Sequence, residues 1–150
     1  MDATHIPSAL PDPEYDAELY EDVAVKRLFA WVIDVLLITA IVGLLVMASL
    51  LVAVFFLPVV YFGVSFLYRC LTLSIGSATP GMRFMSIELR TRDGQKLDPA
   101  TAILHTAGYA LSVVTVPMQL ISIVLMLTTS RKQGLTDHVL GTAAVNRPLT

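Results

Sequence analysis

One long apolar stretch constrains this chain more than any other feature of its sequence. Between residues 28 and 67 the only formally charged side chain is Asp34, and residues 107–127 contain none. The chain is 55% hydrophobic and 15% charged, whereas a typical soluble domain is about 45–50% apolar and about 25% charged. In a chain of 150 residues this pattern predicts a small multi-pass membrane domain and excludes an ordinary soluble one.

The length of the first apolar stretch predicts two crossings. A straight helix over residues 28–73 would rise about 65–70 Å, which is roughly twice the hydrocarbon thickness of a bilayer. We therefore expect two spans, at about 27–47 and 50–72, joined by a tight turn near Ala48. Pro58 lies inside the second predicted span and is expected to bend it, because proline removes a backbone hydrogen bond.

A polar segment follows the second span and carries turn and strand signals. Its first part, residues 74–81, predicts a loop. Polar and apolar side chains then alternate from Phe84 to Arg90, a period typical of a strand. The Asp-Gly pair at 93–94 predicts a hairpin turn, with the return beginning at Lys96. A further short strand is expected near residues 141–146, where it could pair with the strand at 84–90.

The third apolar segment is predicted to start at Asp98-Pro99, a typical helix start. It runs to about residue 128 and is interrupted at Pro117. A third crossing and a pair of short helices that enter the membrane and return both remain open. The fold class is thus an all-α transmembrane bundle, with two full spans, a proline-broken segment at 99–128 and a small cytoplasmic strand pairing.

Residues 1–23 are predicted to form a disordered acidic cytoplasmic tail, because seven of the twelve acidic residues precede residue 23 and alternate with prolines. Tyr15, Leu19 and Tyr20 recur at helical spacing and offer the alternative of a docked segment. Without a basic patch, no nucleic-acid binding is expected. One cysteine, Cys70, and dispersed histidines predict no metal site, and no cofactor is expected.

Basic residues at the span ends predict the orientation. Lys26 and Arg27 precede the first span and five more basic residues follow the second, whereas the turn between the spans has none. By the positive-inside rule, the N-terminus and residues 74–98 are expected to be cytoplasmic. The basic residues after the third segment, such as Arg131, obey the same rule only if that segment returns, which favours a cytoplasmic C-terminus.

Asp34 is the most informative single residue. A carboxylate at the centre of a lipid-spanning helix costs about 2.5–3.5 kcal/mol, so other groups must compensate for it. Arg27 lies two helical turns earlier on the same face. The sequence leaves two interpretations open, a structural acid that bonds to other helices and an ion or proton site.

Three short motifs, in this order, resemble the RDD family of small membrane proteins over about residues 24–147. The motifs are Arg27-Leu28-Phe29-Ala30 with Ile33-Asp34, then Gly76 and Thr79-Pro80-Gly81 with Arg83, then Gln133-Gly134-Leu135 with Asp137 and Gly141-Thr142. The chain departs from the family pattern at Met82, where a basic residue is usual, and at Thr136, where a histidine is frequent.

The resemblance implies that Arg27, Asp34 and Asp137 are the signature charges of the family. We expect one network in which Arg27 is held between Asp34 and Asp137 and ties the first span to the C-terminal segment. Gly76 and the residues Thr79, Pro80 and Gly81 are expected to form a structural turn. The resemblance also implies a location in a bacterial-type inner (plasma) membrane.

Two classes of function fit these features. We favour a non-catalytic interaction, accessory or assembly component, which contacts the lipid bilayer and binds its own copies or another membrane protein. The alternative, suggested for members of the family it resembles, is an oligomeric cation/proton exchanger with Asp34 as the ion or proton site. Two or three spans per chain would then require an oligomer, because alternating access needs two bundles. An enzyme is not expected, since no nucleophile, base and orienting group occur together.

Overall fold

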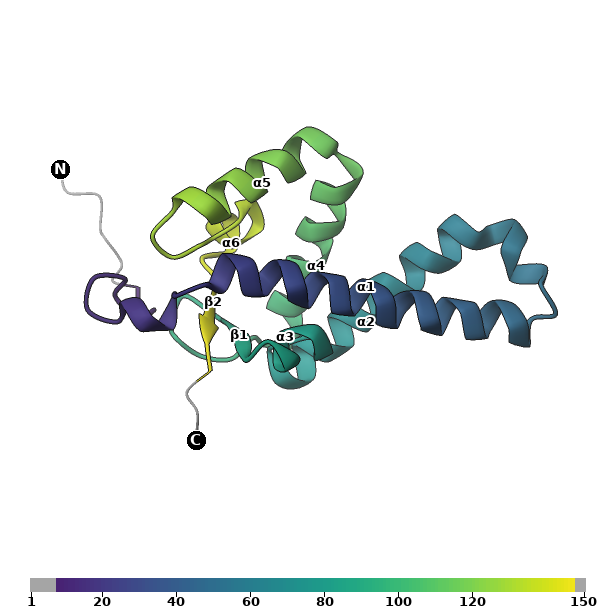
Figure 1. The fold of residues 1–150 in the computed structure, drawn as a ribbon, viewed down its shortest axis with the longest axis horizontal. Coiled ribbons are helices and arrows are strands. Elements are labelled where there is room, and N and C mark those ends of the chain that lie inside the picture. Colours follow the sequence, from purple (N-terminus) through teal and green to yellow (C-terminus); the bar gives the residue numbers. More distant parts are fainter. Residues whose placement is uncertain (1–7, 148–150) are drawn as a thin grey trace.

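The computed structural model describes residues 8–147 and is mostly helical (Figure 1). Two antiparallel strands are the other regular elements, as predicted. In chain order the elements are η1 (Ala17–Leu19), α1 (Val23–Ala48), η2 (Val52–Phe56), α2 (Leu57–Gly76), α3 (Pro80–Phe84), β1 (Ile87–Arg90), α4 (Pro99–Val114), α5 (Val116–Thr128), α6 (Leu135–Leu140) and β2 (Ala143–Asn146).

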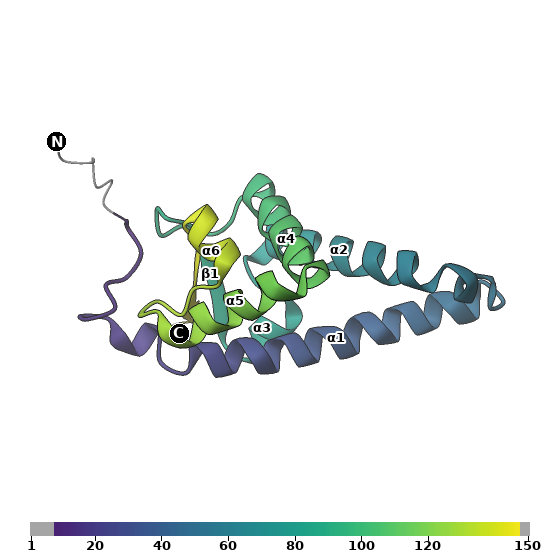
Figure 2. The same ribbon diagram turned by 90° about the horizontal axis from the view of Figure 1, so that it is seen from above.

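Helices α1 and α2 form a long hairpin that projects from the rest of the molecule (Figures 1 and 2). Both are long and apolar enough to cross a membrane. Leu50 and Leu51 have positive φ angles and close the turn after Ala48, where the sequence predicts it. The predicted bend at Pro58 is wrong, because Pro58 lies in the first turn of α2. A proline fits there, since the first backbone N–H groups of a helix have no partner within it.

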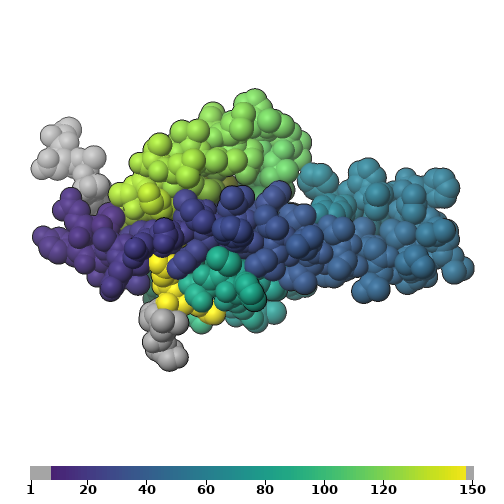
Figure 3. All heavy atoms as spheres, in the orientation of Figure 1, coloured from purple at the N-terminus to yellow at the C-terminus, as the bar shows by residue number. Residues whose placement is uncertain are grey.

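The third apolar segment is broken, as predicted, and its two halves differ in direction by 116°. The break is at Thr115, and Pro117 lies in the first turn of α5. At 16 and 13 residues, α4 and α5 rise about 24 and 20 Å, so neither crosses about 30 Å of hydrocarbon alone. Together they form a lobe beside the first half of α1 (Figure 3).

Strands β1 and β2 pair in antiparallel register, with Ile87 opposite Asn146 and Arg90 opposite Ala143. Two details of the predicted strand are wrong. The strand begins at Ile87 rather than Phe84, because Phe84 ends helix α3, which Thr79 caps by accepting a hydrogen bond from Met82 N at 3.2 Å. The chain does turn after β1, but β1 pairs with β2 rather than with a return strand at Lys96.

The buried core lies where the sheet meets the first turns of α1. One cluster joins the α1 residues Val23 and Ala30 to both strands and to α2 and α4; its other members are Leu73, Ile87, Leu89, Leu97, Ala102 and Ala144. The N-terminal segment forms a second cluster with the outer face of β2, made of Leu10, Tyr20, Ala143 and Val145. This docking differs from the disordered tail expected over residues 1–23. Residues 1–7 lie outside the described residues.

Candidate functional site

The carboxyl group of Asp34 is enclosed by donors from two other helices and is 1% exposed. Its Oδ1 accepts hydrogen bonds from the Tyr68 hydroxyl of α2 and from the Gly81 backbone N–H of α3, both at 2.8 Å. Its Oδ2 accepts one from the Thr79 hydroxyl at 2.5 Å. Asp34 therefore fastens α1 to α2 and α3 through three bonds.

Small residues allow α3 to approach α1 this closely. A Cβ added at Gly81 would lie 2.2 Å from the backbone carbonyl oxygen of Ala30 and 2.8 Å from Asp34 Oδ1. Gly76 is less constrained, since a Cβ there would lie 2.1 Å from the Arg83 guanidinium, the end of a flexible side chain that can move. The predicted structural turn is thus the last residue of α2, a short link and the capped start of α3.

The carboxylate of Asp137, in α6, is 0% exposed and accepts four hydrogen bonds. Oδ2 accepts from Arg27 Nη1 at 2.7 Å and from the Gly134 backbone N–H at 3.0 Å. Oδ1 accepts from His105 Nε2 at 2.9 Å and from the Thr142 hydroxyl at 2.8 Å. A carboxylate has about four lone-pair positions, so the described residues fill all of them.

The structure thus brings Arg27 and Asp137 together and places Asp34 elsewhere. The expected single network, with Arg27 between two aspartates, is wrong in its Asp34 half. Asp34 follows Arg27 by seven positions along α1, a rise of about 10 Å, and Asp34 is already bonded to closer donors on α2 and α3. Two separate carboxyl centres replace the single predicted one.

Nearby cations hold the pKa of Asp137 well below its usual range. Burial alone would raise this pKa, but the Arg27 guanidinium and the hydrogen bond and charge of His105 outweigh it, with a further contribution from the Gly134 N–H. A buried carboxylate that is bonded to a cation stabilises the fold as long as it stays ionised.

This shift predicts an acid-sensitive fold. Because the folded-state pKa is lowered, Asp137 stabilises the fold above the ordinary carboxyl pKa of about 3.9, and this stabilisation decreases as the pH falls below it. We expect the difference in unfolding free energy between wild type and Asp137→Asn to shrink by about 1 kcal/mol from pH 5 to pH 3. Chemical denaturation in detergent at several pH values measures it. A difference that stays constant over this range would contradict the assignment.

Sequence reasoning missed several partners. The sequence indicates neither His105 as a partner of Asp137 nor Tyr68 as a partner of Asp34. Arg69 of α2 lies 4.2 Å from the centroid of the Tyr109 ring of α4, and the Trp31 indole N–H donates to the Tyr109 hydroxyl at 2.8 Å. Such pairings join helices distant in sequence, and neither spacing nor composition indicates them.

No group of three or more potential metal ligands occurs among residues 8–147. Tight hydrogen bonding around both carboxyl groups is typical of a structural role. The Asp34 centre joins α1 to α2 and α3, and the Asp137 centre joins α1 to α4 and α6.

Comparison with known proteins gives one match. The model of the RDD family, a family of small membrane proteins, matches residues 23–141, which include all three predicted signature charges. No curated protein and no solved structure matches the chain.

Proposed function

Because this chain belongs to the RDD family, we propose that it is a non-catalytic assembly or accessory component of a bacterial-type inner membrane. In this role it binds its own copies or another membrane protein. The function of the Arg27, Asp34 and Asp137 groups is then to fix the shape of the domain.

The observation that carries this proposal is that fixed donors of the chain itself bond to both buried carboxyl groups. Asp34 accepts three hydrogen bonds and Asp137 four, all from the chain itself. Asp34, the ion or proton site of the alternative function, is therefore already bonded to fixed protein donors. An exchanger needs a carboxylate that releases its partners in each cycle, and breaking such a buried set of bonds is costly.

The outer surface of the hairpin fits the same role. Large apolar side chains lie exposed along α1, η2 and α2, among them Leu44, Phe55 and Val59. Lipid covers such a surface in a bilayer, and a second transmembrane helix covers it equally well. This supports a lipid-facing hairpin that docks against a partner.

We further propose a cytoplasmic N-terminus and C-terminus. Lys26 Nζ donates to the Asn146 side chain at 2.7 Å, so the start of α1 and the end of β2 lie at one end of the molecule. The α4–α5 pair returns to that end, where Arg131 contacts Pro11. A single orientation thereby satisfies the positive-inside rule for the basic residues in the first two turns of α1 and for those after α5.

Reconstitution distinguishes the proposal from the cation/proton exchanger. Wild type and Asp34→Asn are placed in vesicles that contain a pH-sensitive dye, and sodium or potassium gradients are applied. We expect no cation-coupled pH change from either protein. Coupled flux in wild type that disappears in Asp34→Asn would overturn the proposal.

Cross-linking in native membranes tests the assembly role directly. The single cysteine Cys70 is replaced by serine, and cysteine is introduced at Leu44, which is 72% exposed on α1. We expect a specific cross-linked species, either a dimer of this chain or a complex with one membrane protein. Cysteine at the buried position Ile38 provides the matched control, which should not cross-link.

A further inference from the structure

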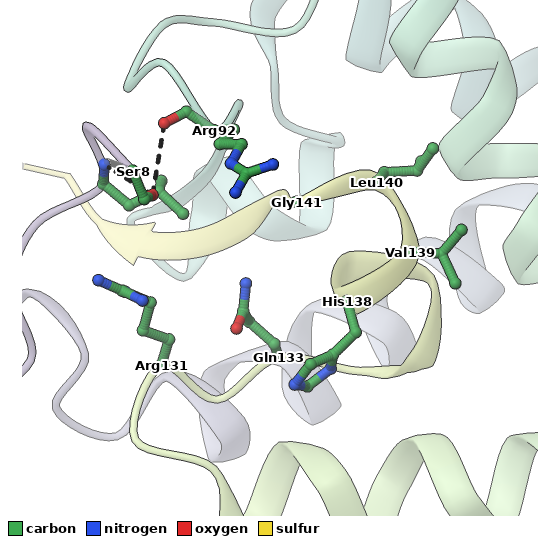
Figure 4. A pocket seen from close by; sticks show the side chains of 9 residues that line it. Ser8, Arg92, Arg131, Gln133, His138, Val139, Leu140 and Gly141 are labelled. Carbon is green, nitrogen blue, oxygen red and sulfur yellow. Dashed lines mark hydrogen bonds between the residues drawn. The ribbon is translucent and has the colours of Figure 1, made fainter. Parts of the chain in front are cut away.

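A polar hollow of about 260 Å³ opens at the end of the molecule that holds the sheet. Three segments distant in sequence form its walls (Figure 4). Ser8 and Leu10 come from the N-terminal segment and Arg92 from the loop after β1. The opposite wall is formed by the α5–α6 link and by α6; its lining residues include Arg131, Gln133 and His138.

The lining of this hollow is basic. Two arginines and a histidine contribute to it, and no aspartate or glutamate is among the described residues that line it. Figure 4 shows the Arg92 and Arg131 side chains on different walls of the same space. An arginine has five N–H donors in a planar fork that matches carboxylate and phosphate oxygens.

Backbone contacts hold this lining in place. Gln133 Nε2 donates to the Thr142 carbonyl oxygen at 2.7 Å. His138 Nδ1 donates to the Gly134 carbonyl oxygen at 2.8 Å. The Arg131 Nε donates to the Pro11 carbonyl oxygen at 3.4 Å. Three separate segments are thus fixed around the hollow before any ligand enters.

The hollow also lies close to the predicted membrane boundary. Arg131 follows the end of apolar α5 by three residues, and Val139, at the rim, is 77% exposed. Phospholipid phosphates are concentrated at this boundary, where basic residues bind anionic headgroups. A polar hollow with two arginines and an exposed apolar rim residue matches a phosphate whose attached chain remains in the membrane.

We propose that this hollow binds a phosphate group, donated either by an anionic phospholipid headgroup or by a free phosphate compound. The Arg92 and Arg131 guanidinium groups bind the phosphate oxygens. The site is separate from both carboxyl centres, and it gives the domain a means of sensing membrane composition or a phosphorylated solute.

Thermal unfolding of the full-length protein in neutral detergent tests this site. We expect inorganic phosphate to raise the melting temperature relative to chloride at equal ionic strength, because a ligand that binds only the folded state stabilises it. Arg131→Gln should weaken the apparent affinity for phosphate at least tenfold, as expected for losing a charge-assisted hydrogen bond. Lys96→Gln removes one charge from an exposed residue outside the hollow and should leave the affinity unchanged.

A second experiment, with lipids, distinguishes a phospholipid headgroup from a free phosphate compound. Micelles containing phosphatidylglycerol are compared with micelles containing phosphatidylcholine. Stabilisation by phosphatidylglycerol that depends on Arg131 supports a headgroup site, and stabilisation by inorganic phosphate alone supports a free phosphate compound. The proposal would be overturned if neither inorganic phosphate nor phosphatidylglycerol raised the melting temperature. It would also be overturned if Arg131→Gln and Lys96→Gln lowered the affinity for phosphate equally. Should Arg131→Gln fail to fold, Arg92→Gln replaces it with the same expected loss.

Discussion

Replacing Asp137 by alanine is expected to lower the free energy of unfolding by about 3–5 kcal/mol, the range for removing one partner of a buried ion pair. The change leaves the Arg27 guanidinium without its carboxylate, and it removes the acceptor for His105, Thr142 and the Gly134 N–H. Denaturation in detergent, followed by the fluorescence of the single tryptophan, Trp31, measures the loss.

Asp93→Ala is the matched control for this experiment. It removes the same charge from an exposed turn residue, where substitutions usually change stability by less than about 0.5 kcal/mol. If Asp137→Ala lowered the free energy of unfolding no more than this control, the carboxylate would not be the group that joins α1 to the C-terminal segment.

Gly81→Ala is expected to cost about 2–4 kcal/mol. The added Cβ would lie 2.2 Å from the Ala30 carbonyl oxygen, which belongs to the backbone of α1 and cannot rotate away. Helix α3 must then move from α1, which adds the cost of overpacking to the loss of the Gly81 N–H bond to Asp34.

Gly63→Ala serves as the control for this substitution, because nothing lies within 4 Å of an added Cβ in that part of α2. Alanine there should stabilise the helix by about 0.5–1 kcal/mol, since glycine loses more backbone entropy on folding. Equal stability changes in Gly81→Ala and Gly63→Ala would show that α3 does not pack closely on α1.

Hydropathy and local caps predicted most of the fold. The uncharged stretches gave the α1–α2 hairpin, and the Asp98-Pro99 pair marked the start of α4. The pairing of the strand near residues 84–90 with the final strand was also anticipated. The helices follow from apolar length and from residues close in sequence, so the sequence indicates them directly. The strand pairing joins distant segments, and local patterns indicate only the two strands themselves.

The errors arise where contacts between distant segments decide the structure. Pro58 would be inside the second helix if that helix began near residue 50. In the structure η2 precedes it, and α2 begins at Leu57, so Pro58 lies in its first turn. Residues 8–22 have the composition of a disordered tail, but Tyr20 and Leu10 gain burial against β2. That surface exists only in the folded protein.

The candidate site was half predicted. Sequence reasoning found Arg27, Asp34 and Asp137 and paired Arg27 with Asp137. It joined Asp34 to the same cation because arginine is the obvious partner for a buried acid. In the structure, neutral donors of Tyr68, Thr79 and Gly81 fill that role instead. Hydroxyl and backbone N–H donors are uncharged and occur throughout the chain, so the sequence does not indicate which of them bond to Asp34.

A pair of double-mutant cycles tests most directly whether Arg27 interacts with Asp137 and not with Asp34. Unfolding free energies are measured for Arg27→Met, Asp137→Asn and Asp34→Asn and for the two double variants that contain Arg27→Met. We predict a coupling energy of about 2–3 kcal/mol between Arg27 and Asp137, and no more than about 0.5 kcal/mol between Arg27 and Asp34. Strong coupling of Arg27 to Asp34, with none to Asp137, would contradict the two separate carboxyl centres.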